Sequence, residues 1–397
     1  MAASARPYVA AASAAGYHVL AADVFGDEET RAASAALLVL PYHQGSFTEE
    51  AMHHDLIPAL SSHQVTYLLY GSGFEAAPGL LELLAQHVPV LGNTAATIAR
   101  CKSPQDFYTS CLALDIPVPD TRFELSSLAD EQREDWLCKR AGRAGGMHVT
   151  PLSAGLPEST GDVYFQRRLT GQPVSLLFLA HEGKVHDVGF QRQLVSPCGD
   201  FHYRYAGLVG PLALAPEVQD VLLQAASRLT AHYGLRGLNS LDAVLGEDGI
   251  YVLEVNPRLS ASLALYDTQA LWLQAHIAAC HGDVAVNIPV AAPSGLGQVQ
   301  ANLVCYSPID VEVPAGFAWP AWVVDRPPAG TRIAQNMPIC TIIATAEDDK
   351  EAERLAYKRA QMLYQRIESS HLNQAINNIE PSGESHESSS FGYQSLA

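Results

Sequence analysis

The sequence is short of positive charge. Its 397 residues contain 24 lysines and arginines against 42 aspartates and glutamates, which gives a formal net charge of −18 at pH 7. Proteins that bind nucleic acid or anionic membranes need a basic footprint, because much of their affinity comes from neutralising phosphate groups. The acidic balance therefore argues against nucleic acid and membrane partners, and it favours small-molecule ligands.

Metal-binding cysteine motifs and long apolar runs are also missing. Neither C-x-x-C nor H-E-x-x-H occurs, which argues against structural zinc. Apolar runs stay below transmembrane length, and the alanine-rich start lacks the leucine-type core of a signal peptide. We expect a cytoplasmic protein with reduced, mostly buried thiols. The seven cysteines are Cys101, Cys111, Cys138, Cys198, Cys280, Cys305 and Cys340.

The most informative polar pattern lies near residue 250. Glu254, Asn256 and Arg258 follow an apolar run at alternate positions, so in an extended strand their side chains share one face. Asp242 lies in a second β-like run, and the turn Gly246-Glu247-Asp248-Gly249 joins the two runs into a predicted hairpin. Carboxylate and amide oxygens are the donors that Mg²⁺ prefers beside nucleotide phosphates. The pattern predicts a metal site flanked by a guanidinium that can hold an anionic oxygen.

Positive charge and glycines occur upstream of this hairpin. Lys102 precedes a helical pattern, and Lys139 ends a short predicted strand. A glycine-bearing loop, residues 142–149, follows Lys139 directly. Gly145 and Gly146 lack a Cβ atom, so their backbone N–H groups can approach phosphate oxygens closely. Together these residues predict a phosphate-binding loop with mobile lysine charge beside it.

The order of these motifs resembles the ATP-grasp family, the carboxylate–amine ligases and their carboxylase relatives. The segment YVLEVNPRLSAS, residues 251–262, is similar to the magnesium-binding end of that family. The stretch from Lys102 to the I-P-V-P exit at 116–119 is similar to its lead-in, and residues 164–171 are similar to its hinge. The resemblance spans roughly residues 96–290. The overall layout looks most like the group that contains the tyramine–glutamate ligases of one-carbon cofactor synthesis.

The resemblance implies a role for each of these residues. Two α+β subdomains would clasp ATP, with a small lid at about 121–170. Lys102 and Lys139 would anchor the phosphates, while Gln166 and Leu169 would contact adenine. The implied metal ligands for one or two Mg²⁺, or Mn²⁺ in its place, are Asp242, Glu254 and Asn256. Arg258 and Lys139 would be the catalytic residues, with Arg258 stabilising an acylphosphate.

The chain on either side divides into further predicted domains. Residues 1–95 alternate helix and strand, which is typical of a doubly wound parallel sheet. Residues 295–368 are predicted to form a small β-rich module plus a helix, and they resemble the C-terminal module of biotin-carboxylase-like proteins. Residues 370–397 are rich in Ser, Glu and Asn, and we expect a disordered tail. The fold class is therefore α/β and α+β.

The N-terminal domain is expected to lack its first strand. Sheets of this type normally begin with an apolar strand whose C-terminal turn leads into the first helix. Here residues 1–6 look like that turn, and Pro7 begins the helix, where proline is well tolerated. A missing central strand would leave unpaired backbone groups and an apolar slot. A domain that closes its sheet without this strand is the alternative.

Residues 172–240 are expected to carry the substrate side. Two strands, Val174–Ala180 and Lys184–Phe190, flank a turn, and an arginine with neighbouring tyrosines suits an anionic substrate. The candidate side chains are Arg192, His202, Tyr203, Arg204 and Tyr205.

The family resemblance implies an ADP-forming ligase. ATP would phosphorylate a small-molecule carboxylate, and an amine would attack the acylphosphate to form a C–N bond. Two alternatives remain: a biotin-carboxylase-like enzyme that activates bicarbonate, and a non-catalytic ATP-binding subunit. Small-molecule acid and amine substrates are the expected partners, and a homodimer is compatible with the sequence.

Overall fold

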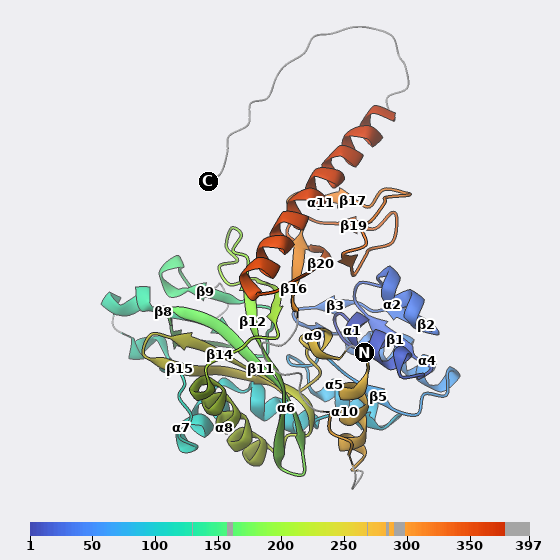
Figure 1. Cartoon of the computed structure of the whole chain (residues 1–397). Coiled ribbons are helices and arrows are strands. Elements are labelled where there is room, and N and C mark those ends of the chain that lie inside the picture. Colours follow the sequence, from blue (N-terminus) through green and yellow to red (C-terminus); the bar gives the residue numbers. More distant parts are fainter. Residues whose placement is uncertain (129, 157–161, 268, 283–285, 290–297, 378–397) are drawn as a thin grey trace.

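A computed structural model describes residues 1–128, 130–156, 162–267, 269–282, 286–289 and 298–377. Figure 1 shows three parts: an N-terminal region of short strands and helices, a long central sheet, and a C-terminal helix that projects from the body. Within the described residues, no helix combines the length and apolarity needed to cross a bilayer. All seven cysteines are free and five of them are buried, as predicted.

The N-terminal region contains two separate parallel strand pairs. β1 pairs with β2, and β5 pairs with β6. Short helices connect these strands, and β3 and β4 form a small hairpin. The elements are α1 (Arg6–Ala14), β1 (Leu20–Asp23), α2 (Glu28–Ala33), β2 (Ala36–Val39), β3 (Tyr42–His43), β4 (Ser46–Phe47), α3 (Glu49–Ala51), the π-helical turn η1 (Met52–Leu56), α4 (Ile57–Ser62), β5 (Leu68–Leu69), α5 (Gly79–Ala85) and β6 (Val90–Leu91).

The first three residues bridge the two pairs. The Ala2 N–H donates to the carbonyl of Ala22 at 3.1 Å, and the Ala3 N–H donates to the carbonyl of Ser72 at 2.8 Å. Beside this bridge lies a cavity of about 310 Å³ between β1 and β5, and most of its lining is apolar.

The central sheet has eight antiparallel strands in the order β15-β14-β11-β12-β13-β16-β20-β18. Its core includes the fully buried Leu176 and Phe178 of β11 and the buried face of α8. The C-terminal strands β16, β18 and β20 continue this sheet beyond β13. The strands are β11 (Gly171–His181), β12 (Lys184–Val195), β13 (Tyr205–Gly210), β14 (Gly237–Gly246), β15 (Gly249–Asn256), β16 (Val299–Tyr306), β18 (Val323–Val324) and β20 (Pro338–Ala346).

Helices flank this sheet, and a four-stranded lid sheet lies beside it. The lid strands follow the order β7-β10-β8-β9 and enclose a small core around Trp136 and Phe165. The lid comprises β7 (Thr121–Arg122), the 3₁₀ turns η2 (Leu125–Ser127), η3 (Asp130–Asp135) and η4 (Leu152–Ala154), β8 (Trp136–Arg140), β9 (Val149–Pro151) and β10 (Val163–Arg167). The flanking helices are α6 (Ala95–Lys102), α7 (Pro104–Ala113), α8 (Pro216–Tyr233), α9 (Leu263–Tyr266) and α10 (Leu271–His281).

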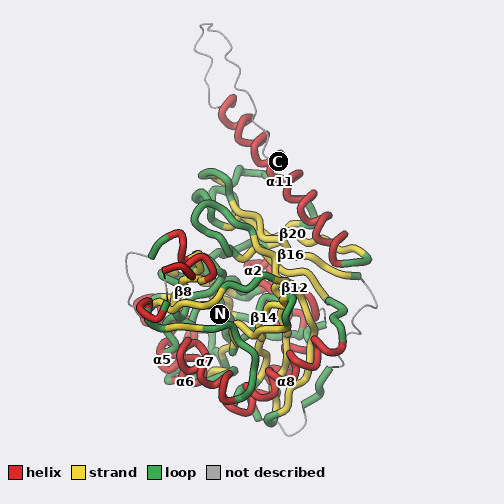
Figure 2. The backbone as a smooth tube through the Cα atoms, turned by 90° about the vertical axis from the view of Figure 1, so that its left-hand side faces the viewer, coloured by secondary structure: helices red, strands yellow, loops and turns green. Residues whose placement is uncertain are grey.

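The C-terminal helix α11 (Asp349–Asn377) packs by one face on β16 and β20 and then projects away from the body (Figure 2). A small hairpin of β17 (Val311–Glu312) and β19 (Arg332–Ile333) lies nearby. The face of α11 that packs on the sheet is apolar, and Ala352, Ala356 and Leu363 on it are fully buried. The predicted boundary at residue 370 is wrong, since helical hydrogen bonding continues to Asn377. Residues 378–397 of the predicted tail lie outside the described residues.

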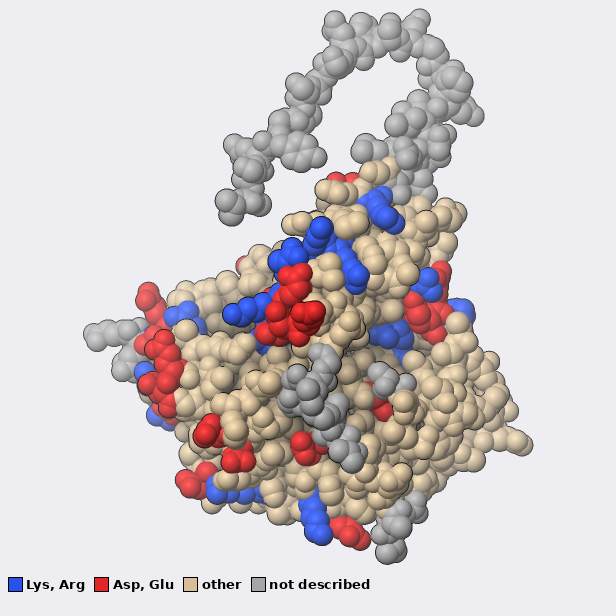
Figure 3. Space-filling view, viewed as in Figure 1, with Lys and Arg blue, Asp and Glu red and all other residues tan. Residues whose placement is uncertain are grey.

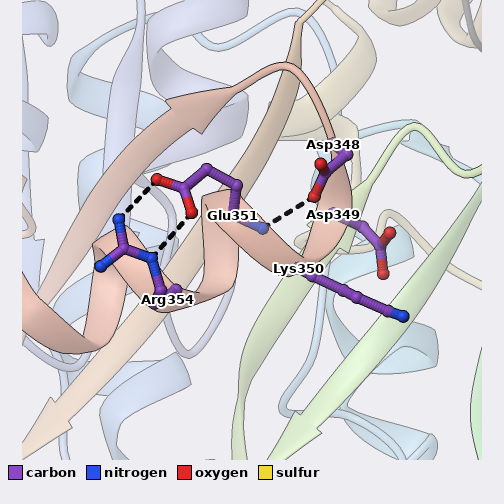
Figure 4. Close-up of a pocket in the computed structure, with 5 residues that line it drawn as sticks. All are labelled: Asp348, Asp349, Lys350, Glu351 and Arg354. Carbon is purple, nitrogen blue, oxygen red and sulfur yellow. Dashed lines mark hydrogen bonds and ion pairs between the residues drawn. The ribbon is translucent and has the colours of Figure 1, made fainter.

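Charged side chains gather along α11 on the face drawn in Figure 3. A hollow of about 450 Å³ lies over the start of the helix, lined by Asp348, Asp349, Lys350, Glu351 and Arg354. Figure 4 shows that three of these residues pair with each other: Asp348 accepts the Glu351 N–H at 2.8 Å, and Glu351 accepts from Arg354 at 2.6 Å. Because these are the contacts of a helix N-terminus, we assign the hollow a structural role.

Candidate active site

The predicted hairpin is β14–β15, and it brings the proposed metal ligands together. Asp242 lies directly opposite Glu254 across the two strands, and Ser240 lies opposite Asn256. The Asn256 amide donates to Asp242 Oδ2 at 3.0 Å and to Glu254 Oε1 at 3.4 Å. The three predicted metal ligands therefore converge on one point.

Lys102 completes this cluster from a distant part of the sequence. It is the last residue of α6, and its Nζ donates to Glu254 Oε2 at 2.9 Å and to Asn256 Oδ1 at 2.6 Å. The lysine side chain is 7% exposed, whereas that of Glu254 is 42% exposed. The carboxylate of Glu254 therefore contacts Lys102, while part of the side chain remains exposed.

The two carboxylates have opposite electrostatic surroundings. Burial and the neighbouring charge of Glu254 raise the pKa of Asp242 to about 7. Burial acts on Glu254 in the same sense, but Lys102 and Lys139 outweigh it and lower the pKa of Glu254 to about 2. Among the described residues, no cluster of three or more His, Cys, Asp or Glu is placed to hold a metal ion. The predicted set combines two carboxylates with an amide.

Lys139 lies on the lid, and its charge acts on Glu254 of the same cluster. Its strand β8 pairs with β10, which places Lys139 opposite Tyr164. The Lys139 ammonium donates to Gln166 Oε1 at 3.0 Å, and the Gln166 amide donates to Thr121 at 3.3 Å. Lys139 and Gln166, two residues predicted to bind ATP, therefore contact each other.

A small cavity of about 20 Å³ lies behind this pair. The lining residues come from α7, the lid and β15, and most are apolar or aromatic: Pro104, Phe107, Tyr108, Val118, Thr121, Tyr164, Gln166, Val252 and Leu253. A cavity of this volume holds about one water molecule, so it does not accommodate a nucleotide base as it stands. Gln166 lines this cavity, whereas Leu169 follows β10 and is not part of the lining.

The glycine loop packs on the residues before β13. Gly145 and Gly146 both have positive φ, and the Tyr205 N–H donates to the Gly145 carbonyl at 2.9 Å. A Cβ on Gly146 would overlap the Tyr203 carbonyl, so this glycine is required for packing. A Cβ on Gly145 would meet no described atom within 4 Å. Gly145 therefore keeps the open approach that the sequence predicts for a phosphate loop.

Arg258 contacts a residue that sequence reasoning did not select. Its Nε donates to Glu75 Oε1 at 2.7 Å, and both side chains are buried. Glu75 Oε2 accepts the N–H groups of Gly73 and Phe74 at 2.7 and 3.0 Å. Burial would raise the pKa of Glu75, but Arg258 and Lys102 reverse this and lower it. Glu75 lies in the glycine-bearing loop after β5, and the G-S-G-F-E sequence there was the available signal.

His148 is a second residue that the motifs did not point to. It lies in the glycine loop, and its Nδ1 is buried without a hydrogen-bond partner. Burial and Lys139 lower the pKa of His148 to about 4. A neutral imidazole with a free nitrogen therefore lies close to the lysines and to Glu254.

The predicted substrate-side residues divide into two groups. Arg192 donates to Asp349 at 3.2 Å and to Glu353 at 2.7 Å, both on α11, and its role on the substrate side stays a prediction. Arg204 donates to the Ser196 carbonyl and lies over the ring of Tyr306, which gives it a structural role. Tyr205 is the exception, because its hydroxyl lies within the electrostatic reach of Asp242.

A known family model matches this part of the chain. The model of the ATP-grasp domain covers residues 106–262, which include the lid, the glycine loop and the β14–β15 hairpin. The chain carries an ATP-grasp domain. The predicted fold class is thereby confirmed, and the two-part clasp is the lid sheet set against the central sheet.

Several solved structures are similar in fold to most of this chain. The biotin carboxylase of Campylobacter jejuni is 13% identical with a TM-score of 0.68, over 88% of this chain and 88% of that chain. The biotin carboxylase domain of the Hydrogenobacter thermophilus 2-oxoglutarate carboxylase, with MgADP and bicarbonate, is 11% identical with a TM-score of 0.66, over 87% and 85%. The carboxyaminoimidazole ribonucleotide synthase of Aspergillus clavatus, with ATP, is 15% identical with a TM-score of 0.62, over 92% and 98%. At these identities the likeness shows a shared fold.

Proposed function

We propose that this ATP-grasp protein is an ADP-forming ligase that joins a small-molecule carboxylate to an amine. A carboxylate oxygen of the acid attacks the γ-phosphorus of ATP, and the bond to the bridging oxygen breaks to leave an acylphosphate and ADP. The amine nitrogen then attacks the acyl carbon, loses a proton and expels phosphate. The observation that carries this proposal is the convergence of Asp242, Glu254 and Asn256 with Lys102 and Arg258 beside them.

The donor set of the hairpin fits Mg²⁺. Two carboxylates and an amide oxygen within one cluster are hard ligands, and Mg²⁺ takes one or two such groups together with phosphate oxygens and water. Mn²⁺ accepts the same oxygen ligands and is a suitable substitute. When bound, the metal would neutralise phosphate charge. Asp242, Glu254 and Asn256 would hold it.

The remaining residues would bind ATP and stabilise charge. Lys102 and Lys139 would move from their present partners to the phosphates, and Gly145 would offer an unobstructed N–H. Gln166 and Leu169 would contact the adenine. Arg258, held by Glu75, would stabilise the acylphosphate and the oxyanion that forms when the amine attacks. This assignment needs no side-chain nucleophile.

A second candidate is a carboxylase that activates bicarbonate. The similarity to biotin carboxylase structures covers 87% and 88% of this chain, so it reaches the C-terminal strands that extend the central sheet. The third candidate, a non-catalytic ATP-binding subunit, could lose Glu254 or Asn256 at little cost. Their presence beside Lys102 and Asp242 therefore favours catalysis.

An ADP-release screen separates the three candidates. Pooled carboxylates and pooled amines, alone and together, would be tested at millimolar Mg²⁺, with one arm of bicarbonate alone and one of glutamate plus tyramine. The ligase predicts release that requires both an acid and an amine. Release with bicarbonate alone would support the carboxylase, and release in no arm would support the binding subunit. The glutamate and tyramine arm tests the predicted subtype in one-carbon cofactor synthesis.

Oligomeric state and location complete the proposal. We expect a homodimer, because the Hydrogenobacter thermophilus structure is a dimer of biotin carboxylase domains. We also expect a cytoplasmic protein, since its seven free cysteines suit a reducing compartment. Sedimentation analysis and cell fractionation test these two expectations.

A further inference from the structure

Lys102 occupies the position where a metal ion is proposed to bind. Its Nζ lies 2.9 Å from Glu254 Oε2 and 2.6 Å from Asn256 Oδ1. Both residues are ligands in the proposed metal site. An ammonium and a divalent ion on the same two oxygens repel each other strongly, because two positive charges would meet in a partly buried site. Lys102 and the metal ion therefore compete for one position.

The surroundings of Lys102 explain why it rests there. Its side chain is 7% exposed, so the ammonium needs a negative partner close by. Asp242 and Glu254 lie opposite each other on the hairpin, and the lysine lowers the repulsion between them. Lys102 is the last residue of α6, and its side chain is a flexible four-carbon chain. Its charge can therefore move while the helix stays in place.

A nucleotide would offer the lysine a second partner. Lys139 and the open side of Gly145 mark the expected phosphate position, and Lys139 is among the charges that act on Glu254. Phosphates placed there would carry several negative charges into reach of Lys102. They would draw the ammonium away from Glu254 and Asn256 and free both oxygens.

We infer that Lys102 is a positioning residue that makes metal binding depend on nucleotide. In the absence of nucleotide its ammonium fills the cation position between Glu254 and Asn256. With nucleotide bound, Lys102 transfers to the phosphates and the divalent ion takes its place. This inference rests on the proposed metal site, and it adds an order of binding that the fold alone does not require.

Direct measurement of Mn²⁺ binding tests this order. Full-length protein would be titrated with Mn²⁺ and followed by the loss of the free-ion signal in electron paramagnetic resonance, without nucleotide and with ADP. Protein-free ADP titrations would be subtracted, because ADP binds Mn²⁺ itself. Wild-type protein should bind Mn²⁺ strongly with ADP and weakly without it. Lys102→Met should bind Mn²⁺ without nucleotide at least about tenfold more tightly than wild type, since a nearby positive charge is gone.

Lys139→Met is the matched control. It also removes a lysine charge near Glu254, but its ammonium contacts Gln166 and not the proposed ligands. It should weaken ADP binding and leave Mn²⁺ binding without nucleotide weak. Lys102→Gln, which keeps a hydrogen-bond donor, serves if Lys102→Met does not fold. Glu254→Gln in the Lys102→Met background should abolish the new binding.

The outcomes distinguish this inference from the proposed function. If wild type binds Mn²⁺ with ADP, but Lys102→Met and Lys102→Gln bind it no better than wild type without ADP, the order of binding is wrong and the metal site stands. Equal affinity of wild type with and without ADP leads to the same conclusion. If wild type with ADP and both Lys102 variants without it all fail to bind Mn²⁺, the metal site itself is wrong.

Discussion

The central sheet and the N-terminal region differ in how completely their strands are paired. The central sheet runs through eight strands, and its middle strands are buried on both faces. The N-terminal region has two parallel pairs joined through residues 1–3, with a cavity of about 310 Å³ between them. The proposed ligands lie on the well-paired sheet, where a rigid backbone fixes their spacing.

The less completely paired region nevertheless positions the site. Glu75 holds Arg258, and the Tyr70 hydroxyl donates to the carbonyl of Pro257 at 3.2 Å. The Asn93 amide donates to the same carbonyl at 3.0 Å. The turn after β15 is therefore set by side chains from the N-terminal region. The metal ligands should therefore withstand changes in the N-terminal region better than Arg258 does.

Removing the Glu75–Arg258 ion pair should have the largest effect on stability, because this pair joins the N-terminal region to the turn after β15. Glu75→Ala leaves the Arg258 guanidinium without its carboxylate partner and two backbone N–H groups without acceptors, so we expect a loss of about 3–5 kcal/mol in the free energy of unfolding. Urea unfolding measures this change. Glu82→Ala removes an exposed glutamate from α5 and should leave stability unchanged. A Glu75→Ala variant as stable as the control would show that the pair does not join the two regions.

The metal ligands should show the opposite behaviour. Glu254→Gln keeps the shape of the side chain but removes the charge that we assign to Mg²⁺. We expect turnover to fall by about a hundredfold or more, the scale of losing a key electrostatic contact, while the protein still folds. Steady-state ADP release measures turnover once the substrates are known. Normal turnover in this variant would remove Glu254 from the site.

Local sequence patterns predicted the hairpin but not its long-range partners. Alternation with a period of two places Glu254 and Asn256 on one face, and the turn at 246–249 pairs them with Asp242. The contact of Arg258 with Glu75 spans 183 residues, and no periodicity encodes such a contact. The ion pairs of Arg192 are of the same kind, since its carboxylate partners lie on α11.

Sheet continuation was likewise hidden from the sequence. Residues 299–346 read as a module of short strands with Pro and Gly turns, and such a pattern does not show which edge the strands join. The structure pairs β16 with β13, so the C-terminal strands extend the central sheet. Edge pairing depends on where β13 ends in space, which only the folded chain determines.

A histidine between the two regions predicts a pH dependence. His276 of α10 is 1% exposed, and its Nδ1 accepts the N–H of Leu238 on β14 at 2.8 Å. Burial lowers the pKa of His276 to about 4. Because the folded pKa lies below the unfolded value, the stabilisation is present above about pH 6.5 and is lost as the pH falls toward 4.

We expect the titration of His276 to lower the free energy of unfolding by about 2 kcal/mol as the pH falls from about 7 to about 5. Urea unfolding across this range should show a steeper decline for wild type than for His276→Gln, whose amide oxygen can still accept the Leu238 N–H. His281→Gln, an exposed position on the same helix, should retain the wild-type slope. Parallel slopes for wild type and His276→Gln would show that His276 does not titrate on unfolding.

The smallest expected effect tests the packing difference itself. Ala21 on β1 and Ala243 on β14 are both 1% exposed, but Ala21 lines the N-terminal cavity whereas Ala243 lies in the close-packed core of the central sheet. Ala21→Val places two further carbon atoms in empty space, and we expect it to raise stability by about 1 kcal/mol. Ala243→Val forces the same carbons against β11 and β15, and it should lower stability by about 1–3 kcal/mol. Urea unfolding measures the free energy of unfolding of both variants. An increase for Ala21→Val together with a decrease for Ala243→Val requires a cavity between β1 and β5. If both substitutions destabilise the protein to the same extent, the N-terminal region is as tightly packed as the sheet that carries the site.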